Sequence, residues 1–241
     1  MIELIEPDWW NRVPTLTGPT VQLREIEASD TGSLYELITD PRVACYLSPP
    51  PPSLSAFHGF VNWAHDRRAA GTGICLAVVP HGLTQAIGLF QLRSLEPKFR
   101  TAEWGFALGA SFWSTGIFME AAGLVADFAF KHIGVERLEA RAVVENSRGC
   151  RGLEKLGAKG EAILRKSFGR SHSQFLWAIL AEEWRPPVPP DTTEFDAARI
   201  KRDIARAIAA MPPPPPTVKD PPATPFPFFL TDPTVLPDKK D

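Results

Sequence analysis

The chain has 241 residues, of which 44% are hydrophobic and 22% charged, a balance that fits one globular domain with an additional segment. Its formal net charge of −2 argues against a nucleic-acid partner, because nucleic-acid-binding domains usually carry a basic face. The three cysteines lie far apart in the sequence, so they predict neither a disulfide framework nor a metal site. No apolar run reaches membrane-spanning length. We therefore expect a soluble, cytoplasmic protein without a metal or a membrane partner.

The N-terminal part of the chain predicts a strand followed by two helices. Apolar and polar residues alternate over 20–26, as in a half-buried strand. Asp30 stands at the N-cap position of a helix that ends at Asp40, before a proline. Ser53 is the cap candidate for a second helix, which extends to Gly71. The apolar stripe of that helix consists of Phe57, Phe60, Val61 and Ala64.

From residue 74 onward the hydrophobic pattern changes to that of strands. An antiparallel meander is expected from the three segments 74–79, 87–93 and 103–108. The elements expected after it are, in order, a helix at 116–132, a strand at 138–144, a short helix at 147–156, and a closing pair of strands at 163–168 and 175–180. The result is a mixed α+β domain.

The segment Ser114–Phe118 joins the third strand of the meander to the following helix through a turn that contains Gly116. Backbone N–H groups at a helix start are free to bind an anion, and the helix dipole favours negative charge there. The segment is therefore a candidate phosphate site. Neither a dinucleotide fingerprint nor a P-loop motif is present, so from these residues alone an ordinary strand-to-helix connection is the preferred alternative.

Two segments match long family motifs in order and spacing. The first match consists of Ala102, Glu103, Gly105, Leu108, Trp113, Gly116, Glu120 and Ala121. The second consists of Asn146, Arg151, Leu153, Glu154, Lys155, Leu156 and Gly157. Over roughly 14–184 the chain resembles the GNAT superfamily of acyl-CoA-dependent N-acetyltransferases, and more narrowly the ribosomal-protein-alanine (RimJ/RimL-like) branch. The resemblance implies a mostly antiparallel sheet that splays apart at the cofactor site, with helices on both faces.

The resemblance implies transfer of an acetyl group from acetyl-CoA to a primary amine, with a protein N-terminus or a small molecule as acceptor. Glu103 lies at the family's glutamate position on the central strand and is the candidate catalytic base. The alternative is a structural strand glutamate paired with Arg93 or Arg100. The two interpretations have similar weight.

The resemblance also implies how acetyl-CoA is held. The pantetheine arm would lie along the backbone of the splayed strands. Asn146 would bond to the arm or cap the following helix, and Arg151 would reach a phosphate or form an exposed pair with Glu154. The implied cofactor-binding residues are Phe106, Ala107, Leu108, Ser114, Thr115, Gly116, Ile117, Phe118, Met119, Asn146 and Arg151.

Several residues depart from the family pattern. Ser114 and Phe118 replace a glycine and a small residue in the phosphate turn, and Gly149 replaces a serine of the second motif. Leu153 occupies the position at which many family members place a tyrosine acid. These departures leave two alternatives open: a degenerate CoA-binding or non-catalytic scaffold protein, and an enzyme that uses a longer acyl-CoA.

A proline-rich tail is expected at 185–241, following the 1–184 domain, because proline runs cannot form core elements. Within it, 192–211 predicts an amphipathic helix with apolar Ala197, Ile200, Ile204 and Ile208. Such a helix would dock on its own domain, mediate homodimerisation or bind a protein partner.

Overall fold

The structure is a computed structural model that describes residues 8–47, 52–169 and 171–187, together with the isolated helical positions 202, 206 and 209. The amphipathic helix expected at about 192–211 and the rest of the proline-rich tail lie, apart from those three positions, outside the described residues. Within these ranges no helix is both long enough and apolar enough to cross a membrane.

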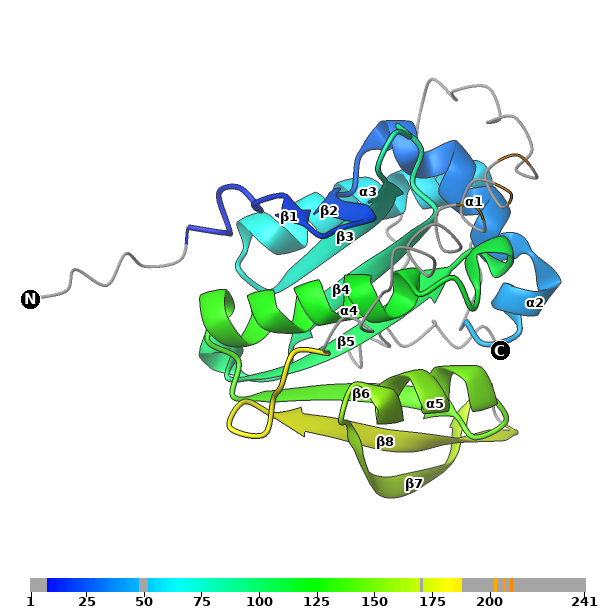
Figure 1. The fold of residues 1–241 in the computed structure, drawn as a ribbon. Coiled ribbons are helices and arrows are strands. Elements are labelled where there is room, and N and C mark those ends of the chain that lie inside the picture. Colours follow the sequence, from blue (N-terminus) through cyan, green and yellow to red (C-terminus); the bar gives the residue numbers. More distant parts are fainter. Residues whose placement is uncertain are drawn as a thin grey trace, which may run out of the picture.

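One mixed sheet forms the centre of the molecule (Figure 1). The described residues contribute eight strands in the order β1-β2-β3-β4-β5-β6-β8-β7. They are β1 (Leu16–Thr17), β2 (Val21–Glu25), β3 (Gly73–Pro80), β4 (Gly88–Ser94), β5 (Thr101–Leu108), β6 (Arg137–Val143), β7 (Lys159–Phe168) and β8 (His172–Leu180). Neighbouring strands are antiparallel except for β5 and β6, which are parallel. The predicted α+β class and its mostly antiparallel sheet are confirmed.

Helices cover both faces of the sheet, as predicted. The main helices are α1 (Thr31–Thr39), α2 (Pro41–Ala44), α3 (Leu54–Ala69), α4 (Ile117–Phe128) and α5 (Ser147–Lys155). Strand β3 is buried on both sides: its Cys75 and Ala77 join the core with α1 and α3, whereas Leu76 and Val78 join the core with α4. This alternation is the period-two pattern of a strand between two helical layers.

Local capping explains several element boundaries. The Ser53 hydroxyl accepts a hydrogen bond from the Ala56 N–H at 3.1 Å, so it caps α3 as predicted. Asp30 directly precedes α1 but makes no side-chain capping bond. Its carboxylate instead accepts two hydrogen bonds from Arg24, at 2.7 and 2.8 Å, and one from the Glu27 N–H. The helix expected at 116–132 becomes α4 and then a π-helical turn at Ala129–Ile133.

Strands β5 and β6 pair only over their first three residues, Thr101–Glu103 with Arg137–Glu139. Beyond Glu103, β5 continues to pair with β4, and β6 continues to pair with β8. The two strands therefore part after Glu103 and leave the β6-side edge of β5 without a strand partner. This parting is the predicted splay.

The described chain just beyond the last strand packs against α4. Trp184 is buried and donates its indole N–H to Asp127 at 2.7 Å. Pro187 lies so close to Gly123 that a Cβ there would come 2.9 Å from its Cγ. The first residues after the expected domain boundary at 184 therefore contact the domain itself.

Candidate functional site

The turn before α4 presents unpaired backbone donors beside the opening between β5 and β6. Gly116 is the N-cap of α4 with a φ of 91°, and Ser114 has a φ of 65°. In the described part of the chain, the N–H groups of Gly116, Phe118 and Met119 donate to no acceptor. These donors lie at the positive end of the α4 dipole. The arrangement is suited to a phosphate.

Phe118 lies inside the first turn of α4 and not in the left-handed region. Its ring packs on Phe106, with centroids 4.8 Å apart, and on Phe90 at 6.1 Å. The Phe118 N–H therefore keeps the orientation of a helix N-terminus although the side chain is large. Of the two unusual residues in the turn, Ser114 is the one that adopts a glycine-type conformation.

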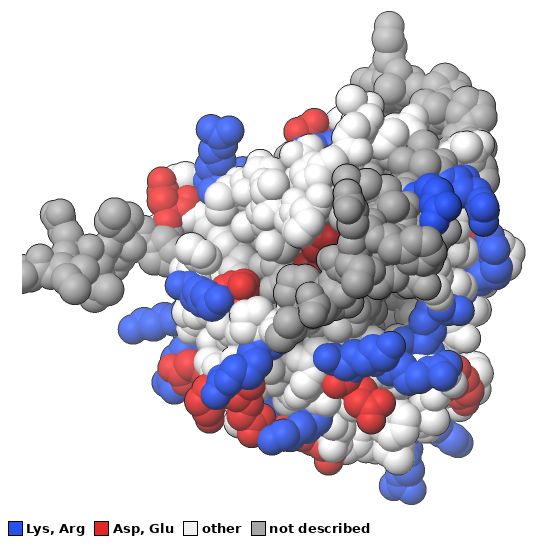
Figure 2. Space-filling view, in the orientation of Figure 1, with Lys and Arg blue, Asp and Glu red and all other residues white. Residues whose placement is uncertain are grey.

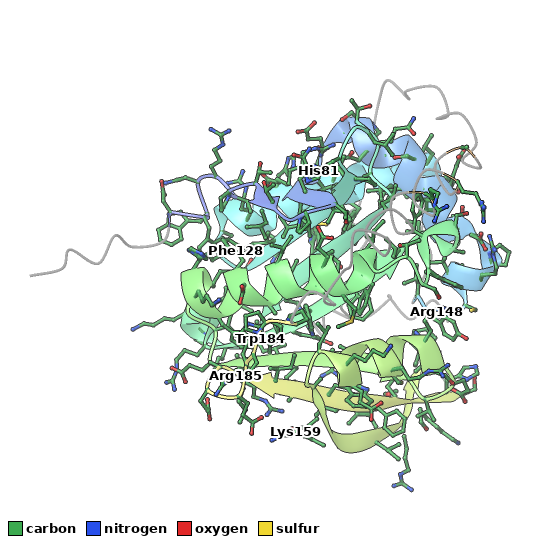
Figure 3. The ribbon with its side chains drawn as sticks, in the orientation of Figure 1. His81, Phe128, Arg148, Lys159, Trp184 and Arg185 are labelled. Atoms are coloured by element: carbon green, nitrogen blue, oxygen red, sulfur yellow. The ribbon has the colours of Figure 1, made fainter. Side chains whose placement is uncertain are left out.

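Arg148 is a candidate site residue that the sequence did not indicate. Its guanidinium lies over the Trp113 ring at 4.6 Å and donates to the Ser114 hydroxyl at 3.2 Å. Figure 3 shows Arg148 between the start of α4 and α5. The second motif had directed attention to Arg151, three residues further along the chain. Only the proximity of two distant segments shows that Arg148, and not Arg151, contacts the turn before α4.

Arg151 is exposed and donates through Nε to the Ser147 carbonyl at 3.1 Å. Among the described residues it makes no ion pair with Glu154, so the exposed pair that was the alternative prediction is not formed. Figure 2 shows Lys and Arg side chains gathered over α5. This helix carries Arg148, Arg151 and Lys155, all of them exposed.

Asn146 caps α5 beside the open end of β6. Its Oδ1 accepts a hydrogen bond from the Gly149 N–H at 2.9 Å. The capping role expected from the sequence is therefore present. The amide Nδ2 has no protein partner within the described residues and remains a donor near the opening.

Glu103 is buried, with 2% of its surface exposed. Its carboxylate accepts from Arg93 Nη2 at 2.6 Å and lies 3.5 Å from Arg141 Nη1. Arg100, the other partner considered, pairs instead with Glu136 at 2.8 Å. The Arg93 contact expected of a structural glutamate is thus present, and catalysis by Glu103 stays a prediction.

A cavity of about 460 Å³ lies on the α3 side of the sheet, next to the point where β5 and β6 part. It is lined by residues of α3, β3, β4 and β6, and Arg93 and Arg141 are among them. Glu103 contacts both of these arginines and is not itself a lining residue. The volume is within the range of small-ligand pockets.

A family model described as an acetyltransferase (GNAT) domain matches residues 20–159. The chain belongs to the GNAT acetyltransferase family. An uncharacterized N-acetyltransferase of Bacillus licheniformis, p20, is 25% identical over 174 residues, which cover 70% of this chain and 98% of p20. The chain is an N-acetyltransferase that transfers an acetyl group from acetyl-CoA to an amine, as the family does.

Solved structures of GNAT acetyltransferases share the fold. Mycobacterium smegmatis RimJ, solved with CoA-disulfide, has a TM-score of 0.62 at 19% identity, covering 77% of this chain and 94% of RimJ. The ribosomal-protein-S5-alanine acetyltransferase of Vibrio fischeri has a TM-score of 0.61 at 18% identity, covering 72% of this chain and 100% of that protein. These similarities show that the chain shares the fold of these two acetyltransferases.

The features of this GNAT chain fit acetyl-CoA as acyl donor. The unpaired edge of β5 offers backbone groups to a pantetheine arm, and the turn before α4 offers N–H groups to a pyrophosphate. Arg148 adds a cation at the same turn. No group of three or more His, Cys, Asp and Glu side chains that could hold a metal occurs among the described residues.

Proposed function

We propose that this chain binds acetyl-CoA between β5 and β6 and acetylates a primary amine that enters from the α3 side of the sheet. The observation that carries this proposal is the coincidence of two features. The strands part after Glu103, and the unpaired N–H groups at the start of α4 lie beside the opening. Together they provide backbone recognition of the arm and an anion site for the pyrophosphate.

In this proposal the pantetheine arm follows Phe106, Ala107 and Leu108. The pyrophosphate is bound by the backbone amides of the turn and the first helical residues, Ser114, Thr115, Gly116, Ile117, Phe118 and Met119. Arg148 and Arg151 supply positive charge to the phosphates, with Arg148 nearer to the turn. Asn146 can serve both expected roles, because its Oδ1 caps α5 while its Nδ2 donates to the arm.

The reaction joins the acceptor nitrogen to the thioester carbonyl carbon and breaks the carbon–sulfur bond, so that the CoA thiolate leaves. The amine must lose a proton, and Glu103 is the proposed acceptor of that proton, directly or through a water. Arg93 and Arg141 fix the orientation of its carboxylate. Leu153 is buried and apolar, so it cannot supply the proton that a tyrosine supplies at this position in many family members.

Two features support a cytoplasmic protein that modifies an N-terminus. Cys45, Cys75 and Cys150 are all free thiols, which suits a reducing compartment. The V. fischeri structural neighbour is named for acetylation of a ribosomal-protein alanine. In the same proposal, the tail mediates either homodimerisation or binding of a protein partner.

Isothermal titration of the full-length chain with acetyl-CoA tests the proposed cofactor site. Saturable binding, weakened by Arg148→Met and unchanged by Arg165→Met on exposed β7, is the expected result. Release of free CoA in the presence of amines then measures the transfer. The absence of binding at millimolar acetyl-CoA, or binding that Arg148→Met leaves unchanged, would overturn the proposed cofactor site. A panel of longer acyl-CoA donors decides the acyl preference.

A further inference from the structure

The cavity on the α3 side of the sheet has an unusual charge. Three guanidinium groups line it: Arg67 from α3, Arg93 from β4 and Arg141 from β6. The carboxylate nearest to them is that of Glu103, which is shared by Arg93 and Arg141. Arg67 makes no ion pair among the described residues and lies over the Trp63 ring at 5.6 Å. One carboxylate thus contacts two of the three cations, and within the described ranges Arg67 is left without one.

Other acidic groups close to the cavity are already paired with arginines that do not line it. Glu25 binds Arg68, and Asp30 binds Arg24 at 2.7 Å. Glu139, beside Glu103 on β6, binds Arg137 at 2.7 Å. The excess positive charge of the cavity is therefore not neutralised by these neighbours.

The floor of the cavity also contains buried polar atoms without partners. In the described part of the chain, Gln91 Oε1 and Arg93 Nε are inaccessible to solvent and form no hydrogen bond. Gln91 itself is only 3% exposed and lines the cavity. Because these two atoms are closed off from solvent, a ligand in the cavity does not reach them. The Arg93 side chain as a whole is 19% exposed, so other atoms of it face the cavity.

Burial raises the pKa of the adjacent Cys75 thiol, so this lining residue stays neutral and adds no negative charge. Gly105, which pairs with Gln91 across β4 and β5, adds no side chain between the cavity and the opening of the sheet. Arg141 is two residues beyond Glu139, the last β6 residue paired with β5. The cavity therefore reaches the place where the thioester would lie.

We propose that the acceptor of this enzyme is a primary amine that also carries a carboxylate. The inference rests on the proposed function, since it assigns the cavity to the acceptor of that reaction. The carboxylate binds among the guanidinium groups of Arg67, Arg93 and Arg141, which line the cavity. Free amino acids and peptides with an acidic first residue both offer this chemistry. Polyamines are excluded, because their ammonium groups would be repelled by three arginines.

Acetyl transfer by the full-length protein to four amines tests the inference: L-glutamate, a peptide that begins Asp-Ala, the same peptide beginning Ala-Ala, and spermidine. We expect the highest kcat/KM with L-glutamate or the Asp-Ala peptide, and the preferred one identifies the source of the carboxylate. Arg67→Met should raise the KM of that amine about tenfold or more, with the KM of acetyl-CoA and the reaction of the Ala-Ala peptide unchanged. Arg165→Met is the matched control and should leave the KM of the preferred amine and the KM of acetyl-CoA unchanged.

Two results would overturn the inference in different ways. A preference for spermidine or the Ala-Ala peptide, or an Arg67→Met variant that behaves like Arg165→Met, would exclude an acidic acceptor and leave the proposed function intact. If none of the four amines received an acetyl group although acetyl-CoA still bound, this inference would fail and the proposed function would stand, whereas loss of acetyl-CoA binding itself would remove both.

Discussion

The Phe118 ring of α4 lies directly against Gly152 of α5, where an added Cβ would come 2.7 Å from Phe118 Cε1. The ring cannot easily move away, because Phe106 lies behind it with a centroid distance of 4.8 Å. A large side chain in the first turn of α4 is therefore compatible with the fold, since the facing helix has no side chain at that point. Helices α4 and α5 therefore pack closely at the contact between Phe118 and Gly152.

This relationship predicts that Gly152→Ala has opposite effects in two backgrounds. In the natural chain the added methyl group overpacks the helix interface and should lower the free energy of unfolding by about 1–3 kcal/mol, which outweighs a helix-propensity gain of about 1 kcal/mol. In a Phe118→Ala background the obstruction is absent, so only the propensity gain remains. Chemical denaturation of the four chains measures both effects.

Gly160→Ala is the matched control, because a Cβ there would lie 3.7 Å from the Trp177 ring, an ordinary contact. It should change stability far less than Gly152→Ala does. Equal destabilisation by Gly152→Ala with and without Phe118 would show that the ring is not what excludes a side chain at 152.

The positive φ of Ser114 leads to a second prediction. A non-glycine residue in this region is strained by roughly 1–2 kcal/mol. Replacement by glycine relieves this strain, but part of the gain is lost because glycine gives the unfolded chain more conformational freedom. Ser114→Gly should therefore raise the free energy of unfolding by up to about 1 kcal/mol, whereas Ser114→Ala should not. Thermal unfolding measures the difference, and a variant pair with the same stability would contradict the prediction. Acetyl-CoA affinity should be retained, because Arg148 keeps its place over Trp113.

Local sequence patterns predict the secondary structure of this chain but not the contacts between its distant segments. Strands β3, β4 and β5 follow from alternating and continuous apolar runs, and Ser53 follows from capping chemistry, because both depend on residues near one another in the chain. The proximity of Arg148 to Ser114 joins positions 34 residues apart in separate elements. Asp30 at a helix start suggests a cap, yet its carboxylate is bound by Arg24. No local pattern predicts such pairings.

Glu103→Gln separates a catalytic role from a positioning role. If Glu103 takes the proton of the amine, the variant should lose about 100-fold or more in kcat with an almost unchanged KM for acetyl-CoA. Glu139→Gln is the control: Glu139 is the cross-strand neighbour of Glu103 and is bound by Arg137. Normal turnover of Glu103→Gln with a changed acceptor KM would mean that the glutamate only orients Arg93 and Arg141.

The three thiols should react with iodoacetamide in the order Cys45, Cys150, Cys75. Cys45 is exposed, whereas burial raises the pKa of the Cys150 thiol and raises that of Cys75 well above its usual value. Because the thiolate is the reacting species, a raised pKa slows alkylation at pH 8. Mass spectrometry of the native chain over time gives the three rates, and the denatured chain provides the control in which they converge. Rapid labelling of native Cys75 would contradict its burial among β3, β4 and α3.

The last prediction concerns Glu120, which ties α4 to the start of β2. Its carboxylate accepts from the Thr20 N–H at 2.7 Å, from the Val21 N–H at 3.0 Å and from the Thr20 hydroxyl. Glu120→Ala removes all three bonds and leaves two backbone donors without partners. The free energy of unfolding should therefore fall by about 1–3 kcal/mol.

Glu154→Ala on exposed α5 is the matched control and should change the free energy of unfolding by no more than about 0.5 kcal/mol. Because Glu120 lies in the first turn of α4, loss of its bonds should also raise the KM of acetyl-CoA while kcat at saturation is retained. A variant with full stability and an unchanged KM would show that α4 is held in place by its apolar face alone.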